Sequence, residues 1–130
     1  MTTDDRGMTD LDPLSQDQVE REILRLSGEL TRQTIMVRTS AQQAAQGDVD
    51  HKRATAMAWL ERVGREGTVP EKEAAVTVAC IAEYREWKLA DAVFRADREK
   101  GQNLRSQLDA LRTIAANQRA AIDYSRGTGD

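Results

Sequence analysis

The chain has 130 residues, of which 39% are hydrophobic, 32% charged and only 4% aromatic, and its formal net charge is −3. This composition is typical of surface-rich helices rather than of a thick globular core, so we expect one domain. No run approaches the roughly 20 apolar residues that span a bilayer, and the acidic N-terminus does not resemble a secretory signal. The sequence therefore predicts a cytoplasmic protein that has no membrane partner.

The distribution of charge and the cysteine content give further predictions about the tail, the partner and the core. Residues 1–20 hold six acidic side chains against Arg6 alone, a balance of −5, so the remaining 110 residues carry +2. We expect residues 1–13 to form a disordered acidic tail, and the chain as a whole is not a generally basic nucleic-acid binder. The lone cysteine, Cys80, has no partner for an internal disulfide and is expected to fill space in a helical core.

A first helix is expected over residues 15–65. Ser15 is placed to act as its N-cap, and Gln18, three residues later, completes a capping box. The apolar period that follows is interrupted at residues 47–50, where Gly47 costs about 1 kcal/mol relative to alanine inside a helix. One kinked helix and two collinear helices both satisfy this pattern, and we favour a kink or short break near Gly47.

A second helix is expected over residues 69–124, after a turn at residues 64–68. Thr68 is placed to cap it, and Glu71 completes a second capping box. The run Ser-Arg-Gly-Thr-Gly then ends the helix, so residues 126–130 are expected to form a disordered tail.

The two helices carry matching heptad patterns. Four pairs of apolar residues lie at equal distances before and after Gly67: Leu30 and Leu104, Leu26 and Leu108, Ile23 and Leu111, and Val19 and Ala115. Their spacings are those of the a and d positions of a coiled coil. The sequence therefore predicts an all-α fold, a long antiparallel helical hairpin with coiled-coil packing, as one domain over residues 14–125.

The apolar residues exceed what two helices can bury between them. The surplus forms a set of candidate interface residues: Leu24, Ile35, Met36, Trp59, Trp87, Phe94 and Ile114. We expect a second copy to cover them, so that two hairpins form a homodimeric four-helix bundle. The alternatives are a groove for another protein and a compact bundle formed if Gly47 and Gly101 break the helices.

Arginine recurs every seven residues along the second helix, at Arg98, Arg105, Arg112, Arg119 and Arg126. The reflection about Gly67 places Arg105 opposite Glu29 and Arg112 opposite Glu22, which predicts intramolecular salt bridges beside the apolar seam. The other three, Arg98, Arg119 and Arg126, have no acidic partner in this scheme. They are the candidate nucleic-acid contacts, because guanidinium groups bind phosphates well.

Motifs for catalysis are missing from the sequence. The single histidine, His51, has no second histidine or cysteine at ligand spacing, which argues against a zinc site and a catalytic triad. Asp48 and Asp50 lie near it, but carboxylates at the start of a helix are far more often capping groups than cation ligands. There is also no glycine-rich phosphate loop. We expect no enzyme, no cofactor and no metal.

Residues 66–74 (EGTVPEKEA), 82–84 (AEY) and 104–112 (LRSQLDALR) resemble segments of small alanine- and arginine-rich helical proteins encoded by phages of actinobacteria. The resemblance covers roughly residues 50–120. It implies a phage accessory protein in the host cytoplasm, of a kind often encoded near replication or recombination functions. It carries no assigned activity and names no catalytic residue.

Two functional hypotheses follow. The first is a non-enzymatic helical protein that binds or modulates a host or phage protein, and the pI of about 5.3 favours it because acidic proteins are repelled by DNA. The second is a DNA-associated recombination or replication accessory, similar in outline to nuclease inhibitors, that uses the arginine stripe. A virion or assembly component is a third, weaker alternative.

Overall fold

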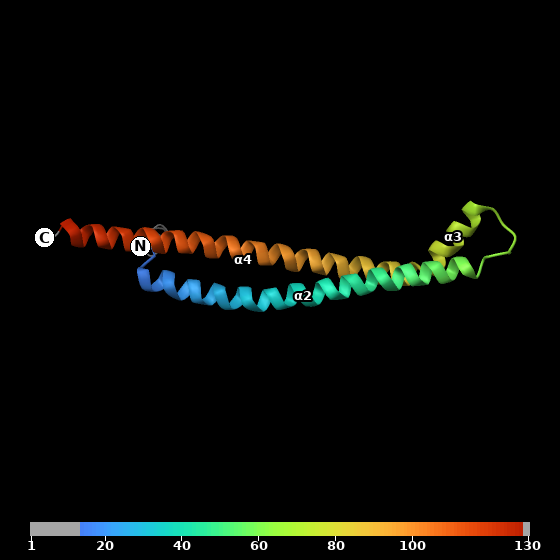
Figure 1. The fold of residues 1–130 in the computed structure, drawn as a ribbon, viewed down its shortest axis with the longest axis horizontal. Coiled ribbons are helices and arrows are strands. Elements are labelled where there is room, and N and C mark those ends of the chain that lie inside the picture. Colours follow the sequence, from blue (N-terminus) through green and yellow to red (C-terminus); the bar gives the residue numbers. More distant parts are fainter. Residues whose placement is uncertain (1–13, 129–130) are drawn as a thin grey trace, which may run out of the picture. The chain divides into compact units, whose positions relative to one another are not determined.

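The computed structural model describes residues 14–128, and the chain is helical through most of this range (Figure 1). Three α-helices follow one another there: α2 (Gln16–Leu60), α3 (Val69–Ala79) and α4 (Ile81–Thr128). The predicted all-α fold class is therefore confirmed. Among the described helices, none is long and apolar enough to cross a membrane. The tail predicted for residues 1–13 lies outside the described residues, as do the last two residues of the tail predicted for 126–130.

By packing, the described residues fall into two compact units. Unit 1 comprises Met1–Thr31 and Asn103–Asp130, and unit 2 comprises Arg32–Gln102. Unit 1 therefore contains the start of α2 and the end of α4. Unit 2 contains the rest of both helices and the whole of α3.

Helix α2 begins as its sequence predicts. The Ser15 amide donates to Gln18 Oε1 at 2.8 Å, and the Gln18 amide donates to Ser15 Oγ at 3.2 Å, so the predicted capping box is confirmed. The helix ends at Leu60 rather than near residue 65. Tight turns follow, with Gly64 at φ 77° and Gly67 at φ 131°. Glycine adopts these left-handed conformations without the steric strain that a Cβ atom would add.

A kink or short break was predicted near Gly47. The break is wrong, because α2 runs without interruption through this residue. A Cβ atom on Gly47 would lie only 3.0 Å from the Cα atom of Trp87. The glycine therefore marks a place where another helix backbone approaches closely within unit 2, rather than the end of a helix. Both roles favour glycine, and the sequence of one helix does not distinguish them.

The predicted second helix, residues 69–124, is divided in two. Its capping box at Thr68 and Glu71 is confirmed, but α3 ends at Cys80, whose backbone adopts φ −107° and ψ 13°. The three β-branched residues 76–78 disfavour a helix slightly just before this point. Burial of Cys80, which is 3% exposed, then fixes the chain where α3 and α4 meet.

At the other end, α4 continues to Thr128, beyond the limit predicted near Tyr124. Gly127 does not adopt a positive φ, so it remains part of the helix rather than capping it. Arg126 lies in the last turn, where a cation interacts favourably with the helix dipole. The disordered tail predicted for residues 126–130 is therefore wrong for its first three residues.

The core of unit 1 is built from long aliphatic side chains of α2 and α4. Leu26, Leu104 and Leu108 are 2–6% exposed and form one cluster. Further members of the predicted seam pack against it: Ile23, Leu30 and Leu111. Val19 and Ala115 are also buried. Apolar burial by these predicted residues accounts for the core of this unit.

Candidate functional site

A pocket of about 710 Å³ lies in unit 2, beside the junction of α3 and α4. Its volume falls within the range of roughly 300–1,000 Å³ that is usual for binding sites. All three helices and their junction line it, through His51, Thr55 and Trp59 of α2, Glu73, Val76 and Thr77 of α3, Cys80 at the junction, and Ile81 and Tyr84 of α4.

The pocket depends on how α3 is held in unit 2. Figure 1 shows α3 leaving the line of α4 at an angle. Val76 and Cys80 are 4% and 3% exposed and form a small core with Ala58, against which Ala54 and Trp59 also pack. Small residues on α2 therefore let the end of α3 approach closely. The rest of α3 diverges, and its pocket-facing residues enclose the hollow.

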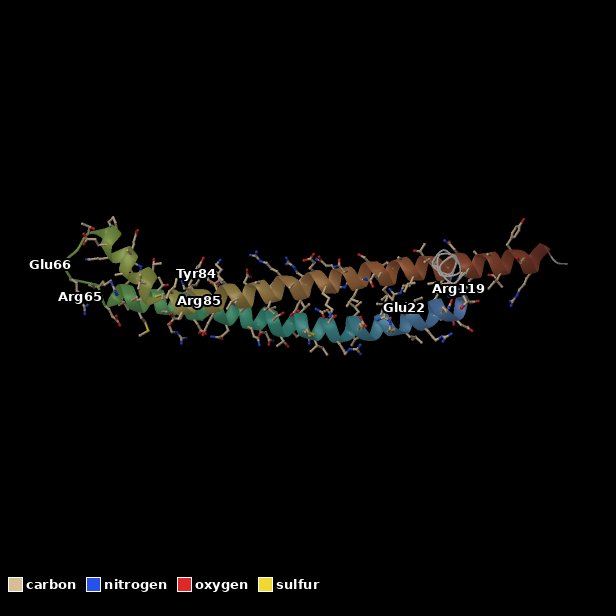
Figure 2. The ribbon with its side chains drawn as sticks, turned by 180° about the vertical axis from the view of Figure 1, so that it is seen from behind. Glu22, Arg65, Glu66, Tyr84, Arg85 and Arg119 are labelled. Carbon is tan, nitrogen blue, oxygen red and sulfur yellow. The ribbon has the colours of Figure 1, made fainter. Side chains whose placement is uncertain are left out.

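Three rings gather where α2 faces the start of α4. The His51 ring stacks on Trp87, with centroids 5.2 Å apart and planes at 21°, and meets Tyr84 edge-on at 5.5 Å. The ammonium nitrogen of Lys88 lies 4.3 Å from the centroid of Trp87. Ring faces attract cations in this geometry. Tyr84 and Arg85 are seen at the start of α4 in Figure 2.

The two hydroxyl groups of threonines in the pocket lining are engaged within their own helices. The Thr55 hydroxyl donates to the His51 carbonyl at 2.8 Å, and the Thr77 hydroxyl donates to the Glu73 carbonyl at 2.9 Å. In the described part of the chain, no three His, Cys, Asp or Glu side chains are grouped as metal ligands. The lining combines apolar and aromatic side chains with the imidazole of His51 and one carboxylate, that of Glu73.

The acidic residues beside His51 are engaged within α2. Asp48 Oδ2 lies 3.2 Å from Lys52 Nζ, and Asp50 Oδ1 accepts from Gln46 Nε2 at 2.8 Å. The interpretation of these carboxylates as capping groups is wrong, because α2 continues through them and no helix begins there. They form the i,i+4 pairs that are common on a solvated helix face.

The two salt bridges predicted between the helices do not form among the described residues. Both acidic partners bind Arg25 instead: Glu22 through a hydrogen-bonded ion pair and Glu29 at 2.7 Å. The hydrogen bond from Arg25 lowers the pKa of Glu22 and raises that of the guanidinium. Arg112 lies 3.7 Å from Asp109 of its own helix. Neighbours one helical turn away are closer than a partner on another helix.

The candidate nucleic-acid contacts lie in different surroundings. Arg98 lies over the Phe94 ring, with its guanidinium carbon 5.4 Å from the ring centroid. Arg119 lines a hollow of about 190 Å³ in unit 1, together with Gln16, Glu20, Ile23, Arg112 and Ala115. Figure 2 shows Arg119 on α4 and Glu22 on α2 in this unit. Arg126 is exposed in the last turn of α4.

The candidate interface residues divide by type. The aliphatic ones and Met36 are exposed, with Leu24 at 74%, Ile35 at 58%, Met36 at 51% and Ile114 at 41%. The aromatic ones are half-buried: Trp59 lines the pocket, Trp87 stacks on His51, and Phe94 lies under Arg98. Only the first group offers large uncovered apolar side chains.

Sequence reasoning missed the pocket and the ring cluster. The signal was present in the reflection about Gly67, which also places Gly47 opposite Trp87 and Ala54 opposite Cys80. The residues of both pairs lie close together in unit 2. Gly47 adjoins Trp87, and Ala54 packs on the cluster that contains Cys80.

Comparisons of the chain with models of protein families, with curated proteins and with solved structures find no match.

Proposed function

We propose that this chain is a non-enzymatic helical interaction protein of the phage accessory type. In this proposal α2 folds back on α3 and α4 as an antiparallel hairpin, two hairpins form a homodimer, and the dimer binds or modulates a host or phage protein in the cytoplasm. The hairpin is supported separately in each unit. Leu26 clusters with Leu108 in unit 1, and Gly47 adjoins Trp87 in unit 2, and both pairs are centred on Gly67.

The observation that carries the proposal is the amount of apolar surface left uncovered in the described residues. Leu24 and Val78 are 74% and 73% exposed, and Leu60, Val63 and Val69 are 64–74% exposed. Scattered apolar residues are normal on any surface, but extended apolar patches are typical of binding surfaces. A protein whose apolar surplus lies outside its own core has the composition of an interaction module.

Sedimentation equilibrium of the purified chain tests the proposal. We expect a mass twice the 14.5 kDa of one chain, falling towards that of one chain only on strong dilution. A single-chain mass at every concentration would contradict the homodimer. Capture of host proteins by the tagged dimer, compared with a dimer that carries charged substitutions at the exposed apolar residues, then tests for a partner.

A second candidate function is DNA association, and one observation favours it. Because Glu22 and Glu29 are bound by Arg25, they do not pair with Arg112 and Arg105 as expected; Arg112 lies near Asp109 of its own helix, and Arg105 has no acidic partner among the described ion pairs. Anisotropy of labelled single- and double-stranded DNA, measured at several salt concentrations, tests this function. Each phosphate contact contributes a slope of about −0.9 to log K against log salt on duplex DNA. Changing Arg98, Arg119 and Arg126 to Glu must abolish binding without loss of helicity.

A further inference from the structure

The end of α4 extends beyond the helix that it packs against in unit 1. Gln118 Nε2 donates to the Leu14 carbonyl at 2.7 Å, just before α2 begins at Gln16. Helix α4 continues past this contact to Thr128, and Figure 1 shows its end running beyond the start of α2. The extension, residues 119–128, is about 15 Å long at 1.5 Å per residue. It begins where α2 can no longer cover it.

The extension presents an apolar residue between two cations. Ile122 follows Ala115 by seven residues, so it continues the apolar seam of unit 1, and it is 37% exposed. Arg119 and Arg126 lie on either side of it along the helix, both exposed, and neither joins an ion pair among those described. Asp123 is the single acidic residue of the extension, which leaves it a balance of +1.

The chain that precedes α2 has the opposite charge. Residues 4–12 hold four aspartates against Arg6 alone, a balance of −3, and they come directly before Leu14, which is held on α4. The first turns of α2, residues 16–22, are acidic as well, with a balance of −2. Electrostatic forces therefore favour placing the acidic segment along the end of α4 and disfavour placing it along α2.

We infer that residues 10–12 (Asp-Leu-Asp) lie along the extension of α4 in the same chain, with the leucine on its apolar residue and one carboxylate at each of its two arginines. Carboxylates and guanidinium groups form charge-assisted hydrogen bonds. The inference does not depend on the homodimer proposed above.

The lengths of the two stretches agree. From Leu14 back to Asp10 the chain spans at most about 13 Å, at roughly 3.3 Å per extended residue. From Gln118 forward to Arg126 the helix rises about 12 Å. The first carboxylate can therefore lie level with Arg126, and the second falls nearer the attachment point, towards Arg119.

Attachment to α2 favours the segment of the same chain over that of a second copy. A short linker gives an effective concentration of the order of millimolar, so a contact that is weak in isolation is still populated. A second copy would offer the same segment only at its concentration in solution. When docked, the segment occupies two arginines that a phosphate backbone would otherwise meet. It therefore acts as an inhibitor of polyanion binding within its own chain.

The test is the broadening of backbone amide signals by a nitroxide attached to Thr9→Cys. Cys80 is only 3% exposed and is shielded from the label. We expect broadening at residues 119–126. Changing Asp10 and Asp12 to Asn should lower the ratio of docked to undocked segment roughly fivefold, because each exposed ion pair contributes a factor of about 1.4 to 5.

The matched control is Asp4→Asn with Asp5→Asn, which removes the same charge from the same labelled segment and should largely retain the broadening. Equal broadening in the two double variants would overturn the inference. Broadening that is strongest on residues 16–22 of α2 would overturn it too.

The arginines are tested in the same way. Arg119→Gln with Arg126→Gln should lose the broadening as the variant of residues 10 and 12 does, whereas Arg53→Gln with Arg85→Gln, at exposed residues of unit 2, should retain it. Circular dichroism checks that the helices persist. A mixture of isotope-labelled chains without nitroxide and unlabelled chains that carry it gives the last check. Broadening in that mixture would place the segment on another copy and contradict the inference.

Discussion

The two units are stabilised by different kinds of contact. In unit 1, long aliphatic side chains of α2 and α4 form the cluster of Leu26, Leu104 and Leu108. In unit 2 the buried apolar cluster is small, with Ala58, Val76 and Cys80, and glycine and ring contacts lie beside it. The difference shows that a heptad pattern can continue along a helix while the contacts it makes change from leucine packing to close backbone approach.

The largest effect is expected from removing a leucine of unit 1. Leu108 is 3% exposed in the centre of the cluster, so Leu108→Ala should destabilise the chain by about 2–4 kcal/mol. Urea denaturation followed by circular dichroism measures this. The control is Leu24→Ala, at a residue 74% exposed, which should change stability by less than about 0.5 kcal/mol. Equal effects of the two variants would mean that the unit 1 cluster is not a real core.

Two glycines of unit 2 test whether close backbone approach stabilises this unit. Changing each of them to alanine should change the stability of the chain in opposite directions. A Cβ on Gly47 would lie 3.0 Å from the Trp87 backbone, so Gly47→Ala should destabilise by about 1–3 kcal/mol through overpacking. A Cβ on Gly101 would lie 3.7 Å from Gln33 Cγ, an ordinary contact. Gly101→Ala should therefore stabilise by up to about 1 kcal/mol, the usual gain in helix propensity.

Thermal unfolding of both variants beside the wild type gives the comparison. A rise in melting temperature for Gly47→Ala would show that helix propensity outweighs the contact with Trp87, and the close approach of the backbones in unit 2 would then be wrong. A fall for Gly101→Ala would show that the space around Gln33 is tighter than described.

The features that were predicted correctly depend on local or repeated signals. The capping boxes at Ser15 and Thr68 each need two residues three positions apart, and the unit 1 seam repeats over several turns. The features that were missed depend on a contact between distant residues. A glycine such as Gly47 is favoured both at the end of a helix and where another backbone approaches closely. Only the position of Trp87 in the folded chain shows that the second role applies here.

The candidate site was harder to predict for the same reason. No Gly or Pro marks the junction at Cys80, which arises where a buried thiol meets Ala58. The pocket beside it combines residues from three helical segments, none of which forms a motif alone. The predicted salt bridges do not form because Arg25 binds Glu22 and Glu29 within its own helix. The reflection about Gly67 compares only residues on opposite helices, so it did not include this competing pair.

The smallest effect is expected at this ion pair of unit 1, as pH falls. The hydrogen bond from Arg25 lowers the pKa of Glu22 in the folded chain. The pair therefore adds stability that is fully present above the ordinary glutamate range, near pH 5, and is lost as pH falls through the lowered pKa. Wild type should thus exceed Glu22→Gln in stability at neutral pH, by a small margin because solvent screens the pair. The margin should close in acid and shrink with added salt. Glu99→Gln, at an exposed carboxylate of unit 2 with no ion pair among those described, provides the baseline. A margin for Glu22→Gln that stays constant down to about pH 2 would show that the carboxylate charge does not stabilise α2 through Arg25.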